Sequence, residues 1–234
     1  MRILLVCRGS RLSAEIQKKA GTEHDWSFLD PMQSTDDDAV NRSVRDMDAL
    51  VHTGEFWTSS STEREPLDIA TRGTFMLMSA AVDAGVKRFV FGSTLNVFED
   101  CPEDVYISEA RRPMPGDTMA VMSPYLAELI CKEFARDHAI TMTCLRLGTL
   151  ADADALEGET PEADWVDYRD AATAFCLALD RDLSSMLNWN LRYSVFHVVG
   201  DHANPRYPRK RERFPGKMLL GLEPKYGFLS DKKA

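Results

Sequence analysis

The sequence lacks any apolar run long enough to cross a membrane as a helix, and the apolar start at 1–6 is too short for a signal peptide. It also lacks an excess of positive charge, since 37 acidic residues against 28 lysines and arginines leave a net charge of −9. Such a surface repels polyanions, so we expect neither nucleic acid nor membrane among its partners. These absences indicate an ordinary globular protein, expected in the cytoplasm.

Cysteines are few, and their spacing shows no pattern. The five of them (Cys7, Cys101, Cys131, Cys144 and Cys176) are odd in number and lack the close spacing of metal-binding pairs. We therefore expect reduced thiols and no metal site. The sequence also has no Gly-x-Ser-x-Gly stretch, which argues against a hydrolase with a nucleophile elbow.

Short apolar runs alternate with segments of helical periodicity. Strands are predicted at 2–6, 26–29, 48–52, 89–91, 140–147 and 194–199, and helices at 13–20, 36–45, 67–84, 124–138 and 168–179. This alternation predicts an α/β protein whose parallel sheet carries helices on both faces. We expect a single domain over 1–234, with a nucleotide-binding core over about 1–150 and a mixed region with a small C-terminal substrate lobe over about 151–234.

The stretch 85–98 organises the rest of the chain. Gly85 suits the end of a helix, because glycine takes the left-handed conformation at little cost. The apolar residues 89–91 predict a buried strand, and Ser93 and Thr94 follow at its carboxyl end. Open α/β sheets bind ligands at that edge. The two hydroxyl groups either serve such a site or only satisfy backbone groups where the strand ends.

Several segments follow the order and spacing of one known family. They are 48–52, 72–74, Ser93-Thr94 with Val97, Tyr125 with Glu133 eight residues on, 146–148, 166–170 and 220–224. Through them the chain resembles the extended short-chain dehydrogenases/reductases, the NAD-dependent epimerase/dehydratase group, over nearly its whole length. The resemblance implies a Rossmann-like doubly wound sheet, NAD or NADP as cofactor, a sugar nucleotide or related small-molecule substrate, and a homodimer.

The same resemblance implies roles for individual residues. Thr94, with Ser93 beside it, matches the catalytic serine or threonine of the family, and Tyr125 matches its catalytic tyrosine. Thr94 would orient a substrate oxygen, and Tyr125 would exchange its proton during hydride transfer. The alternative for Tyr125 is an ordinary half-buried tyrosine at a helix start. The positions that match cofactor-binding residues are Gly9, Ser10, Arg11, Asp30, Thr53 and Gly54.

The turn after the first strand departs from the TGxxGxxG pattern of the family. Its three glycine positions hold Arg8, Arg11 and Ala14, and Gly9 stands at a variable position. The family glycines let backbone amides approach a diphosphate at the start of a helix. Arg11 therefore either fills the space of the diphosphate or supplies a guanidinium group to a phosphate.

The chain departs from the family in two further ways, at position 129 and in the length before residue 48. Leu129 replaces the lysine of YxxxK, and Lys132 lies about two turns from Tyr125 on the same helical face. An ordinary tyrosine titrates near 10, so a base at neutral pH needs its pKa lowered by about 3, roughly 4 kcal/mol, and leucine contributes nothing to this. The chain is also roughly one strand–helix unit short before residue 48, so Asp30 follows either the second or the third family strand.

These features leave two functions open. The first is an NAD(P)-dependent epimerase, dehydratase or reductase that works through Thr94 and Tyr125. The second is a catalytically inactive relative that acts as a dinucleotide or ligand sensor, a regulator or a scaffold. The glycines and the lysine serve different requirements, and the loss of both favours the second function.

Overall fold

The computed structural model describes residues 1–54, 64–156, 162, 164–181, 192–200, 206–207 and 220–228. The strands are β1 (Arg2–Val6), β2 (Asp25–Leu29), β3 (Ala49–His52), β4 (Arg88–Thr94), β5 (Thr141–Leu147), β6 (Leu150–Ala151), β7 (Val166–Asp167) and β8 (Tyr193–Val198). The helices are α1 (Arg11–Ala20), α2 (Asp37–Val44), α3 (Arg64–Asp68), α4 (Thr74–Asp83), α5 (Met119–Asp137) and α6 (Tyr168–Asp180). Short 3₁₀ turns at Pro31–Thr35 and Leu95–Phe98 complete the elements that bear on the site.

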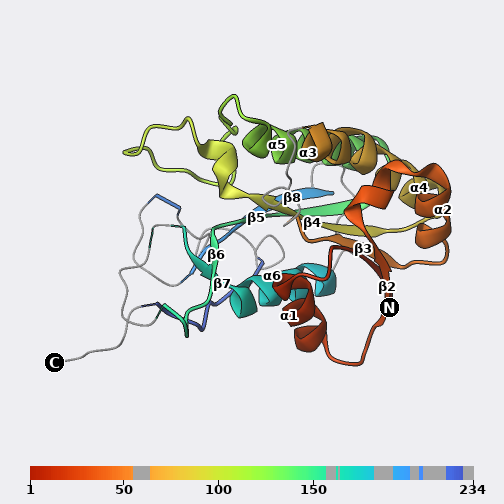
Figure 1. The fold of residues 1–234 in the computed structure, drawn as a ribbon, viewed down its shortest axis with the longest axis horizontal. Helices are drawn as coiled ribbons and strands as arrows, with labels where there is room; N and C mark the ends of the chain where they lie inside the picture. Colours follow the sequence, from red (N-terminus) through yellow and green to blue (C-terminus); the bar gives the residue numbers. More distant parts are fainter. Residues whose placement is uncertain are drawn as a thin grey trace.

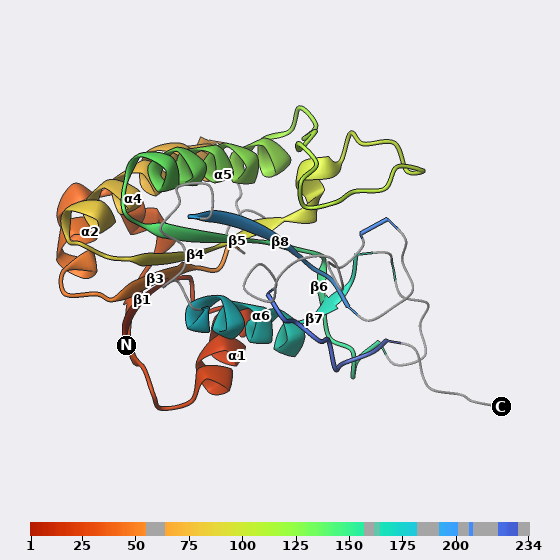
Figure 2. The ribbon, with the colours of Figure 1, turned by 180° about the vertical axis from the view of Figure 1, so that it is seen from behind.

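Six strands form one parallel sheet in the order β2-β1-β3-β4-β5-β8. Helices α2, α3, α4 and α5 cover one face of this sheet, and α1 and α6 cover the other (Figure 1; Figure 2). The predicted α/β fold, a Rossmann-like parallel sheet with helices on both faces, is therefore confirmed. The classic Rossmann order has one more strand outside β2, and no strand in the described part of the chain occupies that place.

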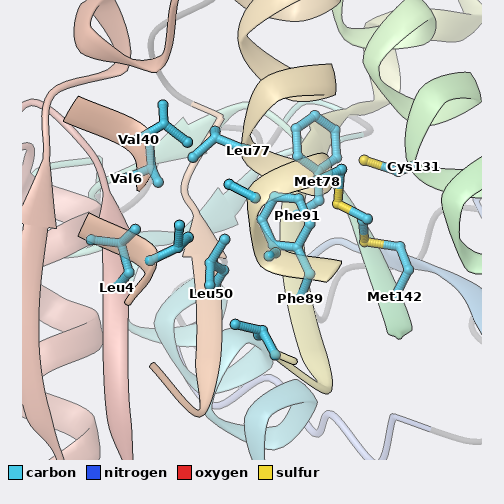
Figure 3. Close-up of a cluster of buried hydrophobic side chains, with 14 of the residues drawn as sticks. Leu4, Val6, Val40, Leu50, Leu77, Met78, Phe89, Phe91, Cys131 and Met142 are labelled. Atoms are coloured by element: carbon cyan, nitrogen blue, oxygen red, sulfur yellow. The ribbon is translucent and has the colours of Figure 1, made fainter. Parts of the chain in front are cut away.

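The central strands are buried on both faces. On one face Leu4, Leu50 and Phe89 pack against Leu77 and Met78 of α4, as Figure 3 shows. The alternate residues of the same strands pack against α1 and α6 on the other face. Because successive side chains of a strand point to opposite faces, burial on both sides requires the uninterrupted apolar runs seen in the sequence.

Local capping sets the helix ends that lead into the organising strand. Gly85 has φ +75°, and its N–H donates to the Val82 carbonyl at 3.0 Å while the Val86 N–H donates to the Ala81 carbonyl at 2.9 Å. This pair of bonds is a Schellman motif, in which a left-handed residue ends the helix. The predicted helix end at Gly85 is confirmed.

The α5 helix differs from its prediction in where it begins and in which face it buries. It begins at Met119, so Pro124 lies inside the helix and the prediction that it is the first helical residue was wrong. Helical spacing predicts a buried apolar stripe of Leu126, Leu129, Ile130 and Phe134, but Leu129 is 38% exposed and the other three are only partly buried. The buried face carries Ala127, Cys131 and Ala135 instead. Small side chains allow the helix to approach the sheet closely, and that contact outweighs the hydrophobicity of leucine.

The helix predicted over 67–84 is divided into two helices. A π-helical turn at Ile69–Gly73 joins α3 to α4, and α3 begins earlier than predicted, at Arg64. A Cβ at Gly73 would overlap the Ser34 hydroxyl, so glycine is required for the close approach of this turn to the 3₁₀ turn Pro31–Thr35.

A second, smaller layer lies beyond the carboxyl edge of the sheet. Strands β6 and β7 pair there in parallel, one on each side of the segment 152–164 (Figure 1). A small apolar cluster joins Ala151 and Ala153 to Trp165, Tyr226 and Phe228. Among the described residues, no helix has the length and apolar character that crossing a bilayer requires.

Candidate active site

The turn between β1 and α1 contains one left-handed residue and leaves open space beside it. Gly9 has φ +69°, and a Cβ built there meets nothing within 4 Å. Ser10 caps α1, because its hydroxyl accepts the Ser13 N–H at 3.2 Å. The first N–H groups of a helix have no acceptor inside the helix, so this end of α1 suits an anion.

Each arginine at a family glycine position is paired with a carboxylate. Arg8 Nε lies 3.6 Å from Asp30 Oδ1, and Arg11 Nη1 lies 2.7 Å from Asp152 Oδ2. The Arg11 guanidinium also stands over the Tyr168 ring, 4.7 Å from its centroid. The hydrogen bond from Arg11 lowers the pKa of Asp152 below its usual value. Sequence reasoning missed Asp152, because nothing local marks a partner 141 residues away.

The register of β2 settles which family strand Asp30 follows. β2 pairs directly with β1, with Leu29 opposite Val6, so Asp30 comes after the strand beside β1. In the classic order that neighbour is the second strand, whose following acid binds the adenosine ribose. The strand missing from the described part is therefore the third one. Asp30 Oδ1 also accepts the Met32 N–H at 2.8 Å, which holds the carboxylate at the strand end.

The ends of β3 and β4 approach each other backbone to backbone. A Cβ at Gly54, where φ is +77°, would overlap the Gly92 carbonyl, and a Cβ at Gly92 would overlap the Thr53 carbonyl. His52 stabilises this turn, since its Nδ1 accepts the Gly54 N–H at 3.1 Å. Thr53 and Gly54 thus shape the middle of the carboxyl edge through their backbone.

Burial keeps His52 neutral and lowers its pKa from 6.5 to about 4. Because the folded-state pKa is the lower one, the unfolded chain takes up the proton first as the pH falls. The contribution of neutral His52 to the free energy of unfolding is therefore complete above pH 6.5 and declines as the pH falls from there to about 4. We expect a loss of roughly 2 kcal/mol at pH 5 relative to pH 7.5, measured by urea unfolding. His52→Asn keeps an acceptor without titrating, and an equal pH dependence in that variant would contradict this assignment.

Thr94 and Tyr125 each border the 3₁₀ turn that follows β4. Thr94 Oγ1 accepts the Asn96 N–H at 3.1 Å and so caps the 3₁₀ turn Leu95–Phe98. Tyr125 on α5 is partly buried against that turn. One turn further along α5, Leu129 presents no polar atom where the family has lysine, and Lys132 is exposed.

Ser93 belongs to a buried polar network. Its hydroxyl donates to Glu128 Oε1 at 2.6 Å, and Arg146 donates to the same carboxylate from Nε at 3.0 Å and from Nη2 at 2.7 Å. The Glu128 and Arg146 side chains are only 3–4% exposed. Burial alone would lower the pKa of Arg146, but the hydrogen bonds and charge of Glu128 raise it above its usual value. The network ties α5, one turn after Tyr125, to the ends of β4 and β5.

The network was not predicted as a unit. Glu128 is the one charged residue on the otherwise small and apolar buried face of α5. A charged side chain at a core position requires a partner, but the sequence did not mark Glu128 as buried, so this signal appears only with the structure. The sequence also gave no indication that the partner of Glu128 is Arg146.

The last described segment is attached to the start of α6. Asp170 accepts the backbone N–H of Lys225 at 2.9 Å and of Tyr226 at 3.0 Å, and the Arg169 guanidinium lies 3.6 Å from the Tyr226 ring centroid. Asp167 pairs with Arg169 at 2.7 Å and accepts the Ala153 N–H at 2.9 Å. These bonds hold 220–228 and the start of 152–156 beside the carboxyl edge.

The parallel sheet, with helices on both faces and its strands crossing over beside β1, has the Rossmann-like arrangement. The model of the NAD dependent epimerase/dehydratase family matches residues 9–154, and the chain belongs to that family.

Individual relatives are distant but extend over most of the chain. The NAD-dependent glucose-6-phosphate dehydrogenase of Haloferax volcanii is 25% identical over 95% of this chain and 92% of its own. The solved glucuronic acid dehydrogenase of Chromohalobacter salexigens is 16% identical, with TM-score 0.74 over 97% of this chain and 85% of that one. The UDP-glucose 4-epimerase of Thermotoga maritima is 17% identical, with TM-score 0.71 over 96% and 94%. The two structural likenesses show a shared fold.

Proposed function

We propose that this protein binds NAD or NADP along the carboxyl edge of its sheet and uses it to oxidise or reduce a sugar derivative. The observation that carries the proposal is that Thr94 and Tyr125, which match the family's catalytic positions, both border the turn after β4 at the carboxyl edge of the sheet. Family membership supports it. So do the names of relatives, which act on glucose 6-phosphate, glucuronic acid and UDP-glucose.

The residues around the turn after β1 fit the adenosine diphosphate half of such a cofactor. The open start of α1 and the guanidinium groups of Arg8 and Arg11 suit a diphosphate. Asp30, at the end of the strand beside β1, suits the ribose hydroxyls. The nicotinamide half has fewer polar partners, because Leu129 offers no hydrogen bond to its ribose.

The bound dinucleotide supplies the hydride donor or acceptor, and the chain's own residues position the substrate and move its proton. The Thr94 oxygen already accepts the Asn96 N–H, so its hydrogen is the part that can be donated to a substrate oxygen. Tyr125 takes the proton from the reacting hydroxyl, or returns it in the reverse direction. Ser93 serves as a positioning residue in this proposal, because its hydroxyl donates to the buried carboxylate of Glu128.

Calorimetric titration with NAD⁺, NADH, NADP⁺ and NADPH tests the proposal. We expect binding of at least one of them at micromolar strength, followed by turnover with a member of a panel of sugar nucleotides, uronic acids and sugar phosphates. No binding of any dinucleotide at millimolar concentration would reject the proposal. Binding without turnover would support the second function, an inactive sensor, regulator or scaffold, which the leucine at position 129 favours.

Three further features accompany the proposed function. We place the substrate lobe in the layer formed by 151–156, 164–167 and 220–228, next to the carboxyl edge. The homodimer stays a prediction, and we place its interface on the outer faces of α4 and α5. Phe75 there is 55% exposed, and its ring centroid lies 5.4 Å from that of Phe134. Analytical ultracentrifugation tests the oligomeric state. The cytoplasmic location also stays a prediction, supported by five free cysteines and decided by cell fractionation.

A further inference from the structure

We propose that Arg11 is a phosphate-binding residue whose guanidinium moves from Asp152 to the cofactor diphosphate when a dinucleotide binds. The inference rests on the proposed function, since it names one of the groups that hold the same cofactor. It makes Asp152 an internal competitor of the diphosphate.

The position of the Arg11 side chain argues against a simple blocking role. Its guanidinium is turned toward Asp152 and Tyr168. A Cβ at Gly9 meets no atom within 4 Å, so the Arg11 side chain does not occupy the space beside that glycine. In this position Arg11 leaves the space immediately beside Gly9 open.

The contacts that hold Arg11 aside are ones that an incoming anion can replace. The Arg11 side chain is 48% exposed and that of Asp152 is 27% exposed. Ion pairs in such surroundings are screened by water and contribute little. A diphosphate carries more negative charge than one carboxylate and offers several acceptors to the planar guanidinium fork. Arg11 is the first residue of α1, so its guanidinium remains within a side-chain length of the turn.

The exchange would also connect the cofactor site to the second layer. The Asp152 carbonyl accepts the N–H groups of Ala155 and Leu156, both at 3.1 Å, and the neighbouring Ala153 N–H is bound by Asp167. Arg11 is thus a direct side-chain link from the nucleotide-binding turn to 152–156. Loss of that link on cofactor binding would leave the start of this segment held by the Ala153–Asp167 hydrogen bond and the Asp154–Arg169 ion pair.

Titration with ADP tests the inference, because ADP carries the adenosine and the diphosphate but not the nicotinamide ribose near Leu129. We expect Arg11→Met to weaken ADP and NAD⁺ binding by about 10-fold or more. Asp152→Asn should strengthen binding by up to about 5-fold, because it removes the competitor. The double variant should bind like Arg11→Met alone, since Asp152 acts only through Arg11.

A matched control pair lies elsewhere on the surface. Arg2 and Asp48 form an exposed ion pair at 3.3 Å, and Arg2→Met and Asp48→Asn should leave ADP binding unchanged. Tighter ADP binding by Arg11→Met would show that Arg11 blocks the diphosphate. Unchanged ADP binding would show that Arg11 does not contact the diphosphate. Either result overturns the inference while the proposed function stands. Failure of every dinucleotide to bind the wild type and all variants would instead reject the proposed function itself.

Discussion

Replacement of Tyr125 by phenylalanine is expected to lower turnover of the sugar substrate by about 10²–10⁴-fold while dinucleotide binding stays unchanged. In the proposed function the hydroxyl exchanges a proton with the substrate, whereas the ring alone maintains the packing of Tyr125 on the turn after Thr94. Steady-state kinetics give the change in kcat, and calorimetry gives the dinucleotide affinity. A fall in both would indicate a disturbed fold and not a lost proton transfer.

Tyr106→Phe is the matched control for this experiment. Tyr106 is 59% exposed, so the loss of its hydroxyl should leave kcat within a factor of about two. Turnover of Tyr125→Phe at the wild-type rate would remove Tyr125 from the mechanism. Thr94→Val should reduce kcat/KM as well, because the substrate oxygen loses its donor.

Replacement of Arg146 by methionine is expected to destabilise the fold by about 3–5 kcal/mol, which lowers the melting temperature of a chain of this length by roughly 6–20 °C. The variant leaves the Glu128 carboxylate buried with the Ser93 hydroxyl as its remaining partner in the network. An uncompensated charge at a site 3% exposed carries most of this cost. Urea unfolding measures the free energy directly.

A double-mutant cycle separates the charge from the packing. Glu128→Met together with Arg146→Met should recover much of the lost stability, because no charge is then left buried. Arg136→Met is the surface control, on the helix that carries Glu128, since Arg136 pairs with Asp137 at 2.8 Å with both side chains half exposed. This variant should change the free energy of unfolding by less than about 1 kcal/mol. A cost for Arg146→Met no larger than that of Arg136→Met would show that the network contributes nothing to stability.

The stability of this network also bears on the proposed chemistry. Glu128 follows Tyr125 by three residues on α5, and its partners lie at the ends of β4 and β5. The network therefore holds the tyrosine-bearing turn of α5 against the strand end that presents Thr94. In the family pattern a lysine one turn after the tyrosine contacts the cofactor, whereas here the neighbouring residue Glu128 holds the helix to the sheet.

The α5 helix shows where sequence patterns were insufficient. Its existence and its end were predictable, because good helix formers run without interruption up to Asp137. The buried face was not, since the larger apolar residues, such as Leu129, lie outside it and the small Ala127 and Cys131 lie inside. Which face a helix buries depends on how closely it can approach the sheet, and side-chain size decided this against hydrophobicity.

The sequence by itself determined the parallel sheet, the helix end at Gly85 and the family, because apolar runs, a glycine at a helix end and motif spacing can be read along the chain. Only the tertiary structure decided that Asp30 follows the strand beside β1, that Arg11 meets Asp152 and that Ser93, Glu128 and Arg146 share one buried network. Strand order and long-range side-chain partners arise from how the elements pack, and residues 18 to 141 positions apart carry no local mark of their contact.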